Sequence, residues 1–302
     1  MITTTALKTQ NSPPRALTCG HHVLDLSSPR VMGILNVTPN SFSQVGRFTV
    51  LDKALKHAER IISEGAAIID IGGEPTNPGV HPIISEQEEL DRVIPIVEAI
   101  SHELPSLPIS IDTSKPNVMK EAISKGASFI NDVRALRHPA SLDIIAKAGV
   151  PVCLMHMLHP DGKPSENSAP DMGDNPLPAI KAFLQARIEA CLAAGISVNS
   201  IVIDPGIGHG SFGKTQRQNL QIMNQLDQFK DMPFPLLIGV SRKTFIGNII
   251  EQPVEGRLHG SLAAAAIAVA KGAAIIRAHD VRETVEAIKV VWEIIGDSGR
   301  SF

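Results

Sequence analysis

Cysteine and long apolar runs are scarce in the 302-residue sequence. The three cysteines, Cys19, Cys153 and Cys191, are odd in number and form neither a CxxC nor a Cys/His metal pattern, which favours a reducing, cytoplasmic location. The longest gently apolar stretch, Leu262 to Ala270, has nine residues and is too short to span a bilayer, so no membrane role is expected. Residues 1–15 contain no apolar core of the kind that secretory signals carry, and we expect them to form a flexible N-terminus.

An excess of positive charge is absent as well. With 28 Lys and Arg against 31 Asp and Glu, the net charge is −3, which gives no basic footprint for nucleic acid. An anionic ligand would therefore have to be held by a few local cations. The sequence also lacks a G-x-S-x-G elbow, a Walker A motif and a Rossmann G-x-G-x-x-G motif. The glycine-rich stretch Gly206–Gly210 is weak evidence of function on its own.

Four apolar runs that end in polar residues are the most informative feature that is present. They cover residues 67–73, 109–113, 201–206 and 274–280. Charged groups are costly in an apolar interior unless they are paired or face a wet cavity. In a barrel of parallel strands, the carboxyl ends of all strands converge on one mouth, where the active site lies. The runs therefore indicate such a mouth.

Apolar runs alternate with helix-like segments along the chain, which indicates parallel strands joined by right-handed crossovers. From Asn36 to His279 there are seven intervals over 243 residues, about 35 each, a plausible (β/α)8 period. The sequence predicts an α/β fold, a (β/α)8 TIM barrel, as a single domain over residues 16–302, with a short extended or hairpin segment at 16–26 that caps the closed end. The expected strands are roughly 31–37, 67–73, 108–113, 129–133, 151–156, 200–206, 236–241 and 275–280, and the expected helices are roughly 51–64, 86–102, 116–125, 140–148, 178–194, 216–228, 258–271 and 282–295.

Four loops on the side of the predicted mouth are long and rich in polar residues, proline or glycine. They cover residues 38–50, 74–85, 159–178 and 206–215. Loops of this length without regular structure are usually lids, binding loops or disordered segments. Their common position favours a site that loops border.

Acidic and amide side chains are expected at this mouth from several strands. Asp112, Asn131 and Asp204 come from three strands, and such groups accept hydrogen bonds from N–H donors such as those of an amino-pyrimidine ring. Asp70 precedes a pair of glycines that lets a ligand or a neighbouring backbone approach closely, and a structural and a functional role suit it equally. Asn36 either satisfies backbone groups at its strand end or supplies an oxygen ligand to a metal or phosphate. Residue type alone favours the former.

Three cation-capable side chains are also expected near the mouth. Arg277 and His279 stand two residues apart on one strand and so share a face. Arginine binds phosphate bidentately and histidine adds a second donor, so the pair predicts an oxyanion site. Lys243 follows an apolar strand, and its place at the rim favours a role there, although surface lysines are common.

Eight motifs occur in a characteristic order between about Val31 and Trp292. They are GILNVTP at 33–39, IDIGGE at 69–74, ISIDT at 109–113, INDV at 130–133, LMHM at 154–157, DPGIG at 204–208, GVSRK at 239–243 and RAHDV at 277–281. With these motifs the chain resembles the dihydropteroate synthase family, the folate-pathway enzymes that sulfonamides inhibit. So many motifs in order are very improbable by chance.

The resemblance implies a homodimeric enzyme that condenses 4-aminobenzoate with 6-hydroxymethyl-7,8-dihydropterin diphosphate and releases diphosphate. It implies that Asp112, Asn131, Asp204 and Lys243 hold the pterin ring and that Met155 lines the pocket. No nucleic acid or membrane is expected as a partner.

The resemblance also implies a phosphate and metal site. Arg277 would stack on the pterin ring and, with His279, hold the diphosphate, while Asn36 would ligate Mg²⁺. The residues implied at the aminobenzoate site or elsewhere around the substrates are Thr76, Pro78, Lys243, Thr244, Asp70 and Phe212, and those implied to be catalytic are Lys243, Arg277, His279 and Asn36.

The sequence departs from the family pattern in its loops. Asn40 replaces an aspartate of the first loop and Asn77 an arginine of the second. The stretch His209–Ser211 looks inserted, so the aromatic contact in that loop is either Phe212 or His209. Two alternatives stay open: a methyltetrahydrofolate-using methyltransferase domain and a catalytically weak pterin-binding protein. The motifs at 241–243 and 277–279 favour the synthase over the methyltransferase.

Overall fold

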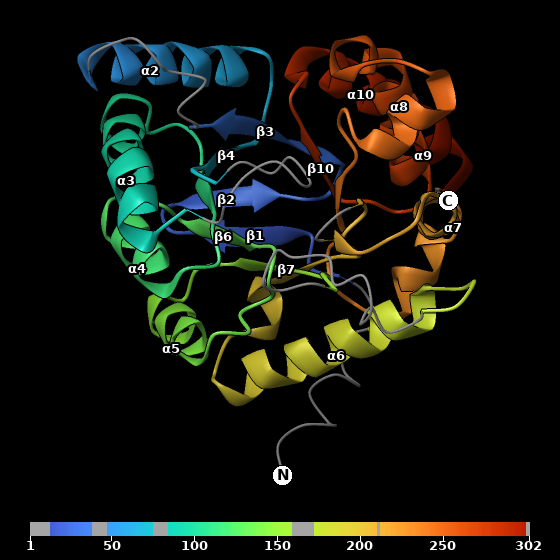
Figure 1. Cartoon of the computed structure of the whole chain (residues 1–302), viewed down its shortest axis with the longest axis horizontal. Helices are drawn as coiled ribbons and strands as arrows, with labels where there is room; N and C mark the ends of the chain where they lie inside the picture. Colours follow the sequence, from blue (N-terminus) through green and yellow to red (C-terminus); the bar gives the residue numbers. More distant parts are fainter. Residues whose placement is uncertain (1–12, 38–46, 75–83, 159–171, 210–211, 300–302) are drawn as a thin grey trace.

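The computed structural model describes residues 13–37, 47–74, 84–158, 172–209 and 212–299 (Figure 1). Its centre is an eight-stranded sheet in the order β8-β7-β6-β5-β4-β3-β10-β9, and all of its ladders are parallel. A parallel bridge between Ile203 and Leu236 joins β8 to the residue before β9, so the sheet closes into the predicted (β/α)8 barrel. The strands are β3 (Arg30–Asn36), β4 (Ile68–Gly72), β5 (Ile109–Asp112), β6 (Phe129–Asp132), β7 (Val152–Met155), β8 (Ile201–Asp204), β9 (Leu237–Gly239) and β10 (Ile275–Ala278).

Helices surround the barrel on its outside (Figure 1). They are α2 (Arg47–Ser63), α3 (Glu86–Glu103), α4 (Pro116–Ser124), α5 (Pro139–Ala148), α6 (Leu177–Ala193), α7 (Gln216–Asn224), α8 (Thr244–Ile250), α9 (Leu258–Ala270) and α10 (Val281–Gly299), with short 3-10 helices η2 (Val198–Ser200), η4 (Leu226–Asp231) and η5 (Val254–Gly256). None of the helices in the described part of the chain is long and apolar enough to cross a membrane. Residues 1–12 of the expected flexible N-terminus lie outside the described residues.

Two helix expectations need correction. The helix expected at 216–228 ends at Asn224, and η4 continues from Leu226. A 3-10 helix repeats every three residues, so it places both Leu226 and Phe229, three apart and buried, against the core. Helix α8 is not among the expected helices, because its seven residues are too few for a periodic apolar pattern.

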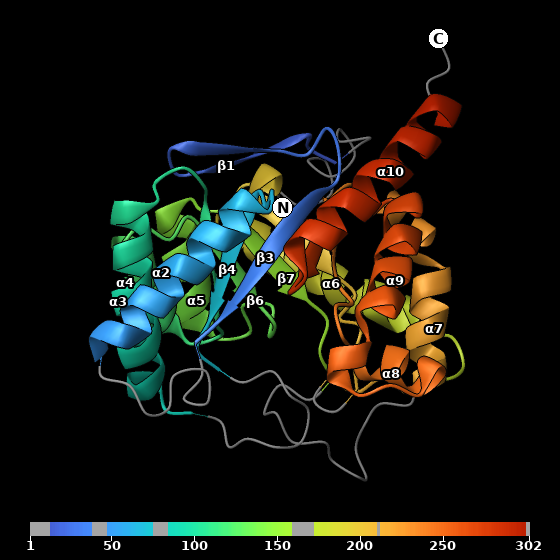
Figure 2. The ribbon, with the colours of Figure 1, turned by 90° about the horizontal axis from the view of Figure 1, so that it is seen from above.

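The barrel interior is apolar at the amino ends of the strands. Alternate residues of a strand point inward, and the lowest of these form one buried cluster: Met32, Ile68, Phe129, Cys153, Val202, Leu237 and Ile275. The antiparallel hairpin of β1 (Ala16–Cys19) and β2 (His22–Asp25) adds Leu17, Cys19 and Leu24 to this cluster. Figure 2 shows β1 lying across one end of the barrel, as expected for a hairpin that caps the closed end.

The interior becomes polar two residues further along the strands. Several side chains of this second layer are polar or charged and buried or half-buried: Asp70, Ser110, Asn131, Asp204 and Arg277. The outward residues of the same strands, such as Leu35, Ile69 and Ile111, belong instead to the core between barrel and helices. The fold therefore presents a polar floor at the carboxyl end of an otherwise apolar barrel.

Candidate active site

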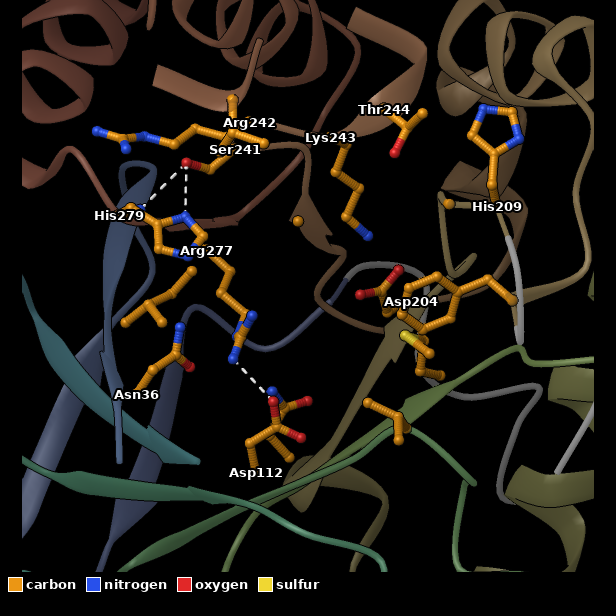
Figure 3. A pocket seen from close by; sticks show the side chains of 18 of the residues that line it. Asn36, Asp112, Asp204, His209, Ser241, Arg242, Lys243, Thr244, Arg277 and His279 are labelled. Carbon is orange, nitrogen blue, oxygen red and sulfur yellow. Dashed lines mark hydrogen bonds and ion pairs between the residues drawn. The ribbon is translucent and has the colours of Figure 1, made fainter. Parts of the chain in front are cut away.

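A pocket of about 270 Å³ opens above this polar layer (Figure 3). It brings together ten of the predicted site residues: Asn36, Asp112, Asn131, Met155, Asp204, Phe212, Lys243, Thr244, Arg277 and His279. They come from six strands and from the segments that follow β8, β9 and β10. Thr76 and Pro78 lie outside the described residues, as do Asn40 and Asn77.

Asp70, the remaining predicted site residue, lies beneath the pocket and has no exposed surface. Its carboxylate accepts hydrogen bonds from Ser110 Oγ at 2.5 Å and Asn131 Nδ2 at 3.2 Å. It also accepts one from Arg277 Nε at 2.6 Å. Asp70 therefore orients two pocket residues and does not itself face the pocket in this structure.

Arg277 bridges two carboxylates on neighbouring strands. Its Nε reaches Asp70, and its Nη2 donates to Asp112 Oδ2 at 2.7 Å. The arginine side chain is 15% exposed, and those of Asp70 and Asp112 are 0% and 9% exposed. Buried charges of this kind are tolerated only when paired and hydrogen-bonded, so the three side chains form one unit.

The two carboxylates that line the pocket are both harder to ionise than an exposed aspartate. Burial raises the pKa of Asp112 to about 7, although the positive charge of Arg277 acts to lower it. Burial also raises the pKa of Asp204, against the opposing charge of Lys243. A ligand that brings N–H donors would stabilise both carboxylates in their ionised form.

Lys243 lies across the pocket from Asp112, at the N-cap of α8 (Figure 3). Its Nζ donates to the carbonyl of Ile207 and stands 4.5 Å from the centre of the Phe212 ring. Burial lowers the pKa of Lys243 to about 8, and Asp204 acts in the opposite direction. The ring of Phe212 packs over Gly208, where a Cβ atom would come within 2.1 Å of it.

One of the two candidate aromatic side chains of this segment lies against the lysine. Phe212 takes that position, and His209 also lines the pocket, with its Nε2 3.3 Å from Gln216 Oε1.

A left-handed turn aims Lys243 into the pocket. Arg242 has φ +57°, and its side chain pairs with Asp280, with Nε 2.9 Å from Oδ2. Its backbone N–H donates to Ser261 Oγ at 2.8 Å, and its carbonyl accepts from Arg257 Nη1 at 3.0 Å. Figure 3 shows the result: Lys243 points toward Asp204, whereas Arg242 points away from it.

Ser241 holds His279 in one orientation. Its Oγ accepts the backbone N–H of His279 at 3.2 Å and lies 3.1 Å from Nδ1 of the ring (Figure 3). Since the hydroxyl accepts one hydrogen bond from the backbone, its own proton is available to donate to Nδ1. In the tautomer that accepts this proton, the neutral ring carries its own proton on Nε2. Burial, with the charge of Arg277, lowers the pKa of His279 to about 4, so the ring is neutral at pH 7.

Several pocket residues were not predicted individually from the sequence. Ser241 and Arg242 stand inside a recognised motif, and Ser241 could have been found from its position two residues after the inward-facing Gly239. Arg257 also lines the pocket, but it precedes α9 and follows no strand, so no local pattern indicated it.

Gly206 is required by a close approach of two backbones. Its φ is +69°, and a Cβ atom there would stand 1.9 Å from the carbonyl oxygen of His156. Gly149 has nearly the same φ, +68°, with nothing within 4 Å of its Cβ position. We therefore expect Gly149→Ala to cost about 1 kcal/mol of unfolding free energy, the ordinary strain of a left-handed alanine, and Gly206→Ala to cost several kcal/mol. Urea unfolding of both variants measures the difference, and equal losses would contradict the close approach.

Asn36, the predicted metal ligand, lines the pocket. Among the described residues, no group of three or more His, Cys, Asp or Glu side chains is placed to hold a metal ion. Asn36 contributes an amide oxygen at the pocket wall, 3.8 Å from the position that a Cβ of Gly72 would take. Mg²⁺ often keeps several waters and is held by one or two protein oxygens together with phosphate oxygens. The residues present therefore fit a magnesium ion that a phosphorylated ligand shares.

Comparison with known proteins gives a consistent result. Residues 32–279 match a protein family described as pterin binding enzyme. The chain is 47% identical over 270 residues to the dihydropteroate synthase of Haemophilus influenzae. The aligned residues cover 89% of this chain and 95% of the relative.

Two solved structures extend the similarity to the fold. A dihydropteroate synthase from Coxiella burnetii in complex with pteroic acid has 43% identity and a TM-score of 0.80, over 93% of this chain and 98% of its own. The Xanthomonas albilineans dihydropteroate synthase with 4-aminobenzoic acid has 42% identity and a TM-score of 0.83, over 93% of this chain and 98% of its own.

Proposed function

The chain belongs to the dihydropteroate synthase family of pterin-binding enzymes, and from this premise we propose how its own residues carry out the reaction. It is a transferase of folate biosynthesis that joins 4-aminobenzoate to 6-hydroxymethyl-7,8-dihydropterin diphosphate to give 7,8-dihydropteroate and diphosphate. The observation that carries the assignment of residues is that side chains from six strands of the barrel meet in one pocket.

The pterin ring is bound by the acidic and amide wall of the pocket. Asp112, Asn131 and Asp204 are buried within this wall, and the two carboxylates accept hydrogen bonds from the N–H groups of the ring. Met155 contributes an apolar surface, and the planar guanidinium of Arg277 stacks against the ring. Such a site discriminates strongly, because an analogue without these donors would leave buried carboxylates unpaired.

The diphosphate is bound by the cationic side of the pocket. Arg277 supplies a permanent charge, and His279 donates through Nε2, since Nδ1 faces Ser241. Asn36 would hold Mg²⁺, which when bound would neutralise charge on the departing diphosphate.

The aminobenzoate lies on the outer side of the pterin, along the wall formed by Lys243, Thr244 and Phe212. Thr76 and Pro78 border the same site in this proposal, although they lie outside the described residues. The arylamine is neutral at pH 7 and needs little help from a general base.

Departure of the diphosphate is the harder step. We infer that the carbon–oxygen bond to diphosphate breaks before the carbon–nitrogen bond forms. The electron-rich pterin stabilises the positive methylene group, and the arylamine nitrogen then loses its proton to solvent. Arg277 and His279 act where negative charge develops. Positional isotope exchange in the substrate diphosphate without 4-aminobenzoate tests this order, and its complete absence would favour a concerted displacement.

Pterin binding should weaken as the pH falls through about 7. Asp112 has a raised pKa of about 7, so below that pH it is increasingly protonated and loses one acceptor for the ring. If only the ionised form binds, affinity at pH 6 is about tenfold below its limit at high pH. The measurement is calorimetric titration with 6-hydroxymethylpterin, which carries no phosphate that titrates in this range. Asp112→Asn should bind weakly and lack this pH dependence, and a dependence that persisted in that variant would assign it elsewhere.

A direct assay of 7,8-dihydropteroate formation from both substrates tests the function itself. We expect turnover with magnesium and a large loss when the metal is removed by a chelator, with recovery on adding it back. A stable protein that binds pterin but forms no product, and fails to rescue a folate auxotroph, would favour the weak pterin-binding alternative.

We also propose that the chain acts in the cytoplasm as a homodimer and forms one domain over residues 16–302. The three cysteines are free and buried, which suits a reducing compartment, and the dimer is implied by the family. Light scattering of the purified protein measures its mass against the 32.3 kDa of one chain.

A further inference from the structure

Lys214 is a buried lysine that the proposed reaction does not use. It follows β8, two residues after Phe212, and is 3% exposed. Its Nζ donates to two backbone carbonyls, that of His156 at 3.2 Å and that of Phe212 at 3.2 Å. Lys214 takes part in none of the close ion pairs between described residues.

The two carbonyls belong to different segments of the pocket. His156 directly follows Met155 at the end of β7, and Phe212 stands in the segment after β8. Met155 and Phe212 both line the pocket. The ammonium group of Lys214 therefore ties together the backbones of two neighbouring parts of the pocket wall.

Asp204 lies near this link between the two backbone segments. Its Oδ1 accepts the backbone N–H of Gly206 at 2.6 Å, and the Cβ position of Gly206 is 3.2 Å from Lys214 Nζ. Lys214 favours the ionised form of Asp204, and Asp204 favours the charged form of Lys214. Lys243 points toward the same carboxylate from the pocket side (Figure 3), so both lysines favour the ionised form of Asp204.

A buried ammonium without a close ion pair is costly in an apolar interior. Burial lowers the pKa of Lys214 to about 7, partly against the effect of Asp204. A methionine of similar length would fill the same space without this cost. A lysine here therefore favours a role that needs its charge or its donors.

We propose that Lys214 is a positioning residue for pterin recognition, which acts through Asp204 by fixing the segments after β7 and β8 behind this carboxylate and by supplying it with a second positive charge. The proposal rests on the pterin site proposed above. It predicts that Lys214 contributes to pterin affinity without touching the ligand, and that this contribution depends on the charge of Asp204.

A double-mutant cycle between Lys214 and Asp204 tests the proposal. The dissociation constant of 6-hydroxymethylpterin is measured by calorimetry for the wild-type protein, Lys214→Met, Asp204→Asn and the double variant. The pH is about 6, because Lys214 has a pKa of about 7 and carries its charge below that pH. We expect Lys214→Met to weaken binding about tenfold in the wild-type background and less than about threefold in the Asp204→Asn background. Lys214→Arg, which keeps the charge, should recover part of the loss.

Lys271→Met is the matched control. Lys271 Nζ also donates to a backbone carbonyl, that of Asn224 at 2.7 Å, but on the outside of the barrel, and its loss should leave pterin affinity unchanged. If Lys214→Met does not fold, Lys214→Gln keeps an N–H donor while losing the charge and should show the same dependence on Asp204. Equal losses in both backgrounds, or no loss at all, would overturn the proposal. Failure of the wild-type protein to bind the pterin would instead reject the proposed site.

Discussion

Replacing Arg277 with methionine should reduce kcat/KM for product formation by about 10³-fold or more. The guanidinium is the only proposed group that contacts both the ring and the diphosphate, and removing one preorganised group at a site of developing charge typically costs 10²- to 10³-fold. The same change leaves Asp70 and Asp112 without their shared partner. Breaking a buried ion pair in this way costs about 3–5 kcal/mol of unfolding free energy.

The activity loss must be separated from the stability loss. Asp70→Asn combined with Arg277→Met removes one of the two carboxylates that the single variant leaves without a partner. The double variant should recover part of the unfolding free energy while activity stays low. Arg187→Met is the control for loss of a part-buried arginine, because Arg187 donates to the carbonyls of Ala135 and Leu136, away from the pocket. If the double variant regained both stability and turnover, Arg277 would be a structural residue only.

Replacing Lys243 with methionine should weaken the binding of both substrates, because Lys243 lies where the two proposed sites meet. It faces Asp204 on the pterin side and the ring of Phe212 on the aminobenzoate side. Loss of a charge-assisted contact is worth about 1.5–3 kcal/mol, so we expect the dissociation constant of 6-hydroxymethylpterin to rise about 10- to 100-fold. The KM for 4-aminobenzoate should rise as well, and steady-state kinetics with each substrate varied in turn measures both effects.

Lys181→Met is the matched control for this change. Lys181 Nζ also donates to a backbone carbonyl, that of Gln228 at 2.9 Å, on the outer surface. Its loss should leave both constants as in the wild-type protein. An effect of Lys243→Met on only one substrate would place the lysine in one site and not at the junction.

Much of the fold could be predicted because its signals are local. Each strand is a short apolar run, and each observed strand begins and ends within two residues of the expected range. The two-residue alternation within a strand also places Arg277 and His279 on one face, and both line the pocket. Helix α8 was not predicted because a seven-residue helix is stabilised by tertiary packing more than by its own sequence pattern.

Adjacent residues show where local patterns stop being sufficient. Asn131 and Asp132 are the last two residues of β6, and successive residues of a strand point to opposite sides. Asn131 lines the pocket. Asp132 faces outward and accepts the backbone N–H groups of Arg134 at 2.8 Å and Leu136 at 2.7 Å, so it shapes the turn before α5.

The sequence alone determined that polar and charged residues stand at the carboxyl ends of parallel strands, because strand formation and side-chain alternation are properties of a few neighbouring residues. Only the tertiary structure decided that Asp70 pairs with Arg277, 207 residues away, and that buried Lys214 donates to the carbonyl of His156. These contacts depend on the closure and register of the barrel, which bring distant strands and the segments after them together. No local pattern contains that information.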